Sequence, residues 1–87
     1  MNFMDKITEM GYAVRENTVE YITIEQKEDV SDLVILLDRK TKSIYSFLRP
    51  NNVISNLDDV CLQYASFRKM KADAKELSAL LGYDIIQ

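Results

Sequence analysis

Histidine is absent from this sequence, and cysteine occurs once, as Cys61. Without imidazole, the chain lacks the commonest general base and the commonest zinc ligand, and it cannot form a Ser-His or Cys-His nucleophile pair. One cysteine without histidine also cannot complete a four-ligand zinc site. These absences predict a protein that is not an enzyme, with no catalytic residues and with no bound metal or cofactor.

The single cysteine also bears on the compartment in which the protein works. Cys61 cannot form an intramolecular disulfide, which fits a reducing environment. It lies on the apolar side of a predicted helix, where a free cysteine usually packs as a small hydrophobic residue. We therefore expect Cys61 to be buried.

Long apolar runs are missing as well. No stretch approaches the ~18 apolar residues that a membrane helix needs. Asp5, Lys6 and Glu9 interrupt the first apolar run, which a secretory signal would not tolerate. These features predict a cytoplasmic protein that begins at its natural start and has no membrane partner.

Glycine occurs twice and proline once, and these low counts argue against a disordered chain, a linker and a turn-rich all-β fold. Two distant glycines also cannot build a glycine-rich phosphate loop. Each glycine follows a helical pattern and precedes a tyrosine, at Gly11-Tyr12 and at Gly82-Tyr83. Each pair is interpreted as a helix stop followed by a residue that favours a strand.

The patterns between these points predict one α+β domain over residues 1–87. It has a short N-terminal helix, an antiparallel meander of three to four strands, and a long C-terminal helix packed on the sheet. Asn2 is a good N-cap for the first helix, and residues 15–18 are typical of a hairpin turn. Strands are expected at residues 12–15, 19–26, 33–37 and 43–49, and residues 83–86 could add a short edge strand.

The last helix is long for so small a domain. Ser55 or Asn56 is expected to cap it, and its pattern continues to about Leu81. At ~1.5 Å per residue, such a helix would extend roughly 39 Å, whereas a domain of about 100 residues has a radius of gyration of ~13 Å. The helix therefore either breaks near Met70, or extends beyond the domain and touches something else.

Both faces of the predicted sheet carry apolar side chains, although an antiparallel sheet usually keeps one face polar. Two arrangements fit this pattern. In the first, the two helices cover opposite faces of the sheet. In the second, both helices cover one face, and a second subunit or another partner covers the face that bears Tyr21, Tyr45 and Phe47.

These features favour a non-enzymatic protein-interaction or regulatory module that is homodimeric and occupies a surface of another protein. The residues expected to anchor the partner are aromatic: Tyr21, Tyr45, Phe47, Tyr64 and Phe67. Small size and missing catalytic groups are typical of accessory proteins, such as those of phages and mobile elements.

The alternative is a nucleic-acid-associated regulator. Its contacts would come from the basic residues of a hairpin tip and of the long helix: Arg39, Lys40, Lys42, Arg68, Lys69 and Lys71. Against this interpretation, the net charge of the chain is −3, and acidic residues are interleaved with the helical bases, as on a solvated face. A third hypothesis is a small-ligand-binding or enzymatic domain, which needs a pocket that 87 residues can scarcely enclose.

Two acidic clusters have simpler interpretations than a metal or acid-base site. The cluster at residues 25–32 lacks the residue order and the glycine of a calcium-binding loop. Asp58 and Asp59 fall at the start of the long helix, where carboxylates are favoured in their ionised form. Capping is therefore the better interpretation of this pair.

Overall fold

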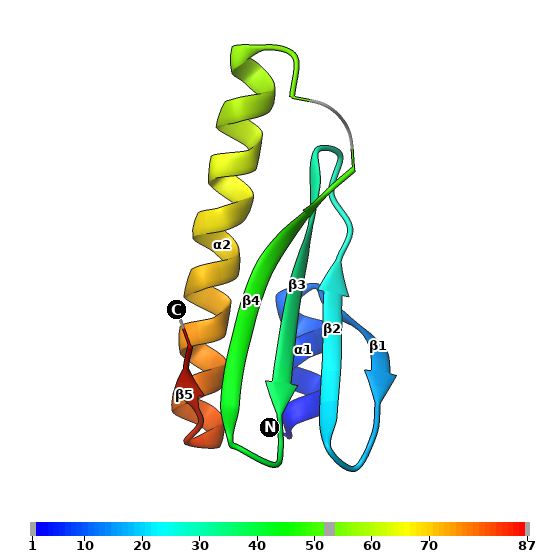
Figure 1. The fold of residues 1–87 in the computed structure, drawn as a ribbon, viewed down its shortest axis with the longest axis vertical. Coiled ribbons are helices and arrows are strands. Elements are labelled where there is room, and N and C mark those ends of the chain that lie inside the picture. The colour runs from blue at the N-terminus through cyan, green and yellow to red at the C-terminus, as the bar shows by residue number, and fades with distance from the viewer. Residues whose placement is uncertain (1, 52–53, 87) are drawn as a thin grey trace.

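The computed structural model describes residues 2–51 and 54–86 and has the predicted α+β fold (Figure 1). In chain order the elements are α1 (Phe3–Met10), β1 (Ala13–Asn17), β2 (Tyr21–Gln26), β3 (Ser31–Asp38), β4 (Ser43–Pro50), α2 (Leu57–Leu81) and β5 (Asp84–Ile85). The strands form one sheet in the order β1-β2-β3-β4-β5. Strands β1 to β4 are antiparallel neighbours, and β5 joins β4 in parallel.

The helices begin and end where the local sequence signals place them. The Asn2 side chain accepts a hydrogen bond from the Asp5 amide at 2.8 Å, and Asn56 caps α2 in the same way. Gly11 and Gly82 adopt left-handed conformations, with φ of 95° and 72°. Residues with a Cβ rarely adopt these angles, so glycine suits both positions. The two Gly-Tyr pairs are therefore helix stops, as predicted.

The first hairpin differs from the prediction. β1 continues to Asn17 and the turn falls at residues 18–20, so the turn predicted at residues 15–18 was placed too early. A β-bulge between Val14 and Glu16 shifts the register of β1 against β2. The bulge accommodates one extra residue and lengthens the strand. Val19, expected in a strand, lies in the turn and is exposed.

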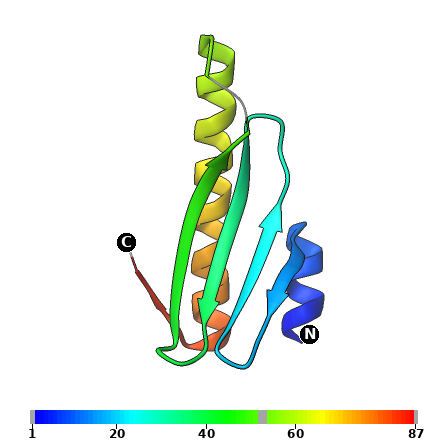
Figure 2. The same cartoon turned by 45° about the vertical axis from the view of Figure 1, so that its right-hand side comes forward.

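Both helices pack on the same face of the sheet (Figure 2), so the first of the two predicted arrangements, with one helix on each face, was wrong. The core combines alternate strand residues with residues of both helices: Ile22, Ile24, Leu33, Ile35, Leu37, Ile44, Ile7, Met70, Ala74 and Leu77. The strand register puts the sheet residues of this set in line, with Ile22 beside Leu37 and Leu37 beside Ile44. No element within the described ranges covers the other sheet face.

α2 is one continuous helix of 25 residues, and it does not break near Met70. It runs along the long axis of a protein that measures 40 × 22 × 21 Å (Figure 1). Met70, Ala74 and Leu77 in its C-terminal half are fully buried. In contrast, every residue from 57 to 69 is at least partly exposed. The N-terminal half of α2 therefore extends past the core.

Cys61 lies in this exposed half, and the prediction that it is buried was wrong. The apolar periodicity around Cys61 correctly indicated one side of a helix. Periodicity cannot show whether another element covers that side, and here the core ends before it reaches Cys61.

Candidate protein-binding surface

The structure divides the five predicted aromatic anchors between two surfaces. Tyr21, Tyr45 and Phe47 lie on the uncovered face of the sheet, because successive residues of a strand point to opposite faces. Tyr64 and Phe67 project from the exposed half of α2, which packs on the other face. The two groups therefore flank β4 from opposite sides and do not form one patch.

The uncovered sheet face is apolar at its centre. Tyr45 and Phe47 are exposed, whereas Val34, which lies opposite Phe47 on β3, is buried by its neighbours on the sheet. Tyr21 lies toward the edge, where its hydroxyl donates to the Glu16 carboxylate at 2.8 Å. This hydrogen bond raises the pKa of Tyr21. The centre of this face is thus available for contact, although its rim is already engaged in polar bonds.

An ionic network bounds this apolar centre at one end. Arg49 donates to the Glu25 carboxylate at 2.6 Å and to the Asp32 carboxylate at 2.8 Å, and Arg15 donates to Glu25 at 3.0 Å. The bond from Arg49 lowers the pKa of Glu25, and the bonds from Asn51 and Arg49 lower the pKa of Asp32. The sequence interpretation missed this network, because only the register reveals that Asp32 lies opposite Arg49.

A shallow hollow of about 290 Å³ lies between the network and the aromatic side chains. Thr23, Val34, Phe47 and Arg49 contribute to its lining. The Thr23 hydroxyl is buried and, within the described residues, has no hydrogen-bond partner. This face therefore already buries one hydroxyl that has no partner among the described residues.

More large apolar side chains are exposed on α2 than on the uncovered sheet face. We call Leu57, Val60, Tyr64 and Phe67 the apolar stripe. Leu57 is 74% exposed, Tyr64 is 62% exposed and Phe67 is 44% exposed. Leu48 of β4 lies beside three of these residues, and together they line an open groove of about 300 Å³. A second groove continues from Phe67 toward β5, so the apolar surface extends along the side of the molecule.

β4 has a free backbone edge next to the apolar stripe. β5 pairs with only the first two residues of β4. The Asn51 N–H donates to Val30, which precedes β3, and the Ile44 carbonyl accepts from Ile86, which follows β5. Because backbone groups alternate in direction along an antiparallel strand, the N–H and C=O groups of Ser46 and Leu48 point away from β3. No described strand pairs with this part of β4 (Figures 1 and 2).

The predicted basic surface is not continuous. Arg39, Lys40 and Lys42 lie at the β3–β4 turn, and Arg68, Lys69 and Lys71 lie in the middle of α2. The Lys69 ammonium donates to the Met10 carbonyl and to Gln26 and Asp73, whereas the Lys71 ammonium donates to Ser46. Lys69 and Lys71 are therefore directed to opposite sides of α2.

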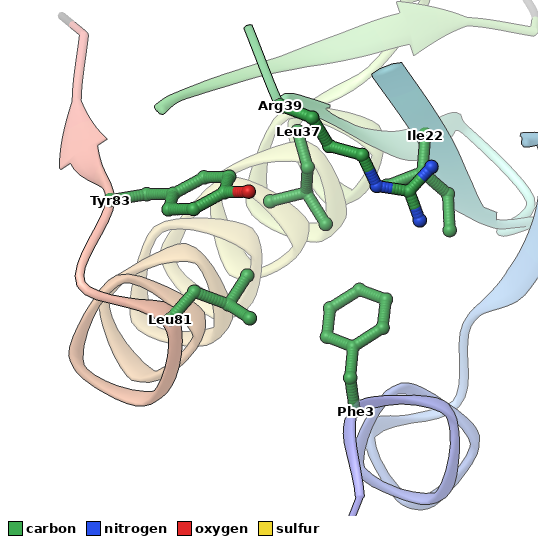
Figure 3. Close-up of a pocket in the computed structure, with 6 residues that line it drawn as sticks. All are labelled: Phe3, Ile22, Leu37, Arg39, Leu81 and Tyr83. Atoms are coloured by element: carbon green, nitrogen blue, oxygen red, sulfur yellow. The ribbon is translucent and has the colours of Figure 1, made fainter. Parts of the chain in front are cut away.

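A small apolar pocket lies at the other end of the molecule, between α1 and the end of α2 (Figure 3). Phe3, Leu37, Leu81 and Tyr83 surround it, and the Arg39 side chain reaches across its rim. The Arg39 guanidinium already donates to the Asn17 side chain at 2.8 Å. The volume of about 180 Å³ is below the ~300 Å³ of ordinary small-molecule sites. The pocket is best explained as incomplete packing between two helix ends.

The part of the chain that the structure describes was searched for clusters of metal-ligating side chains. No cluster of three or more acidic, cysteine or histidine residues there could hold a metal ion. Neither described helix has the length and the apolar composition required to cross a membrane.

Comparison of the chain with protein-family models, curated proteins and solved structures gives no match.

Proposed function

We propose that this chain is a non-enzymatic protein-interaction module. It binds another protein chain through the apolar stripe and the adjacent edge of β4. The observation that carries the proposal is the exposure of four large apolar side chains in a row on one helix, with Leu48 beside them. Contiguous apolar surface of this kind marks interaction sites in soluble proteins.

The stripe has the composition and the rigidity of a binding surface. Tyr64 and Phe67 are aromatic, and aromatic residues supply much of the binding energy in protein interfaces. Charged groups rim the aromatic rings: the Arg68 guanidinium lies 5.9 Å from the Tyr64 ring centre, and the Lys71 ammonium lies 5.4 Å from the Phe67 ring centre. An apolar centre with a polar rim is the usual anatomy of an interface.

The stripe is favoured over the uncovered sheet face for a physical reason. On the sheet face, Arg15 and Arg49 already pair with carboxylates, and Val34 is already buried by its neighbours. A partner would have to desolvate these paired charges, which costs free energy. Binding at the stripe has a smaller desolvation cost, because the exposed surface of the stripe is mostly aliphatic and aromatic.

Site-specific photocrosslinking tests the proposal without knowledge of the partner. A benzophenone amino acid replaces Tyr64 in cells that make the full chain, and the matched control carries it at Leu80, which is also exposed on α2. We expect defined protein adducts, with this chain or with another protein, from position 64 and few from position 80. Absence of adducts at position 64 would overturn the proposal.

A further inference from the structure

We infer that the occupant of this surface is a second copy of the same chain. The two copies are related by a two-fold axis that passes between Val60 and Tyr64 of α2 and beside Leu48 of β4. The inference rests on the proposed function, since it names the partner for that surface. In the resulting dimer the two α2 helices are antiparallel neighbours, and the two β4 edges pair.

The apolar stripe has the spacing of a seam between two helices. Its residues are separated by three, four and three positions, which is the alternation of a heptad seam. In an antiparallel pair about this axis, Leu57 faces Phe67 of the second copy, and Val60 faces Tyr64 of the second copy. A shift by one heptad would instead place Lys71 against Val60. The inferred register is the one that pairs every stripe residue with another apolar residue.

The charges beside the stripe fit the antiparallel direction. Asp58 lies in the first turn of α2, and the Arg68 guanidinium lies next to the Tyr64 ring. In this register Asp58 lies opposite Ser66 of the other copy, two residues (~3 Å along the helix) from Arg68 of that copy, and two-fold symmetry repeats this proximity. In a parallel pair Asp58 would face its own copy, and like charges would repel. Within the described residues, Asp58 has no ion pair that competes with this contact.

The free edge of β4 can pair with its copy about the same two-fold axis. Leu48 lines the groove with three residues of the stripe, so it lies at the level of the axis. Antiparallel pairing about Leu48 forms reciprocal backbone hydrogen bonds between the two copies of Leu48. It also lets the Ser46 N–H donate to the Pro50 carbonyl of the second copy. β5 occupies the edge as far as Ile44, and Pro50 ends the ladder because it has no N–H.

The spacing between elements is compatible with both contacts at once. α2 packs over β3 and β4, and neighbouring strands lie ~4.8 Å apart. A two-fold axis beside β4 therefore places α2 roughly 10 Å from its copy, which is within the range for packed helices.

Cysteine crosslinking tests the register. Leu57→Cys and Phe67→Cys are made separately in a Cys61→Ser background of the full chain, and each is oxidised alone and as a mixture. We expect disulfide-linked dimers in the mixture and none in either variant alone. A Leu80→Cys variant, with a thiol exposed elsewhere on α2, should not link to Phe67→Cys. Disulfide-linked dimers formed by the Leu57→Cys variant alone would indicate parallel helices and would overturn the inference.

Charge reversal and amide exchange supply independent readouts. Asp58→Arg and Arg68→Asp should each weaken the dimer roughly tenfold, and the double variant should recover most of that loss. Amide exchange at Ser46 and Leu48 should slow as the protein concentration rises through the Kd. Additive effects in the double variant, or exchange that is independent of concentration, would contradict the geometry.

The outcomes also separate the inference from the proposed function. A monomer in light scattering at millimolar concentration overturns the inference. If position 64 still crosslinks to another protein in cells, the proposed function stands and the occupant is that protein. If position 64 gives no adduct either, both are overturned. A dimer that does not link positions 57 and 67 uses another surface, which overturns the inference alone.

Discussion

Both halves of α2 carry apolar residues at helical spacing, but one set is buried and the other is exposed. Residues 70–81, which we call the closed half, pack against the sheet, and their core residues are fully buried. Residues 57–67, the open half, carry four large apolar side chains that remain exposed beside the end of β4. The difference shows that burial along this helix is set by what lies opposite each turn, and apolar periodicity alone does not determine it.

Polar contacts hold the closed half to the rest of the fold at its N-terminal end. The Lys69 ammonium donates to Gln26 of β2 at 2.7 Å and to Asp73 at 2.7 Å, and it lies 4.7 Å from the Tyr12 ring centre. The Tyr12 hydroxyl donates to Asp73 at 2.9 Å. Burial and this hydrogen bond raise the pKa of Tyr12. These contacts tie Tyr12, β2 and α2 together near the point where the open half ends.

The largest effect should come from removing a core side chain of the closed half. Leu77→Ala leaves a cavity at a fully buried position and should lower the free energy of unfolding by about 2–5 kcal/mol. Leu80→Ala is the matched control, because Leu80 is three residues away and 49% exposed. It should change stability by about 0.5 kcal/mol or less. Equal losses in urea denaturation would show that the two positions do not differ in burial.

A smaller effect should follow from breaking the polar junction. Tyr12→Phe removes the hydrogen bond to Asp73 and should cost about 1 kcal/mol. Tyr64→Phe is the control in the open half, where Tyr64 is 62% exposed, and it should cost less than about 0.5 kcal/mol. Urea denaturation of the two variants measures the difference. If Tyr64→Phe costs as much as Tyr12→Phe, the hydroxyl of the open half has a partner within one chain.

Acid should weaken the strand end beside the open half through Glu25 and Asp32. Their pKa values are lowered in the folded state, so the unfolded chain binds protons more readily than the folded chain. Their contribution is complete above the ordinary carboxyl pKa of about 4 and is lost as pH falls through the lower folded-state values.

Asp32→Asn isolates this contribution. The variant should lose at most about 1 kcal/mol at neutral pH, because the Arg49 partner is partly exposed. The stability difference between the natural chain and the variant should shrink as the solution is acidified. Thermal unfolding over a pH series checks this, and a difference that grew in acid would mean that the sign is wrong.

The smallest effect on stability should come from Leu57→Ala in the open half. Leu57 is 74% exposed, so the unfolding free energy of dilute protein should change by less than about 0.5 kcal/mol. Light scattering of concentrated protein should nevertheless show weaker self-association. A large loss of stability in dilute protein would mean that this half is covered within a single chain.

The sequence predicted those features that depend on neighbouring residues. Asn2, Gly11 and Gly82 indicated helix ends through local backbone chemistry. Strand alternation placed Tyr21, Tyr45 and Phe47 on one face of the sheet. It could not predict the pairing of Asp32 with Arg49, which depends on the register of two strands. It also predicted the wrong environment for Cys61, because an apolar helix side has the same pattern whether or not another element covers it.

Of the candidate surface, the sequence indicated Tyr64 and Phe67 but not their neighbours in space. Leu48 lies on the core side of the sheet, yet the core ends before Leu48 is fully covered. The overlong helix was the signal that something extended beyond the domain. Its direction relative to β4, which creates the groove, emerged only from the packing of α2 on the sheet.

The bulge in β1 has a consequence for how far the sheet can grow. An exposed straight strand is a template for fibrils, because each added chain presents a new edge to the next. At β1 the ladder is interrupted between Val14 and Glu16, and charged side chains lie along the strand, features that natural proteins use to prevent such stacking. These features disfavour strand addition at β1, so a chain added at the β4 edge would present an equally protected outer edge to the next chain.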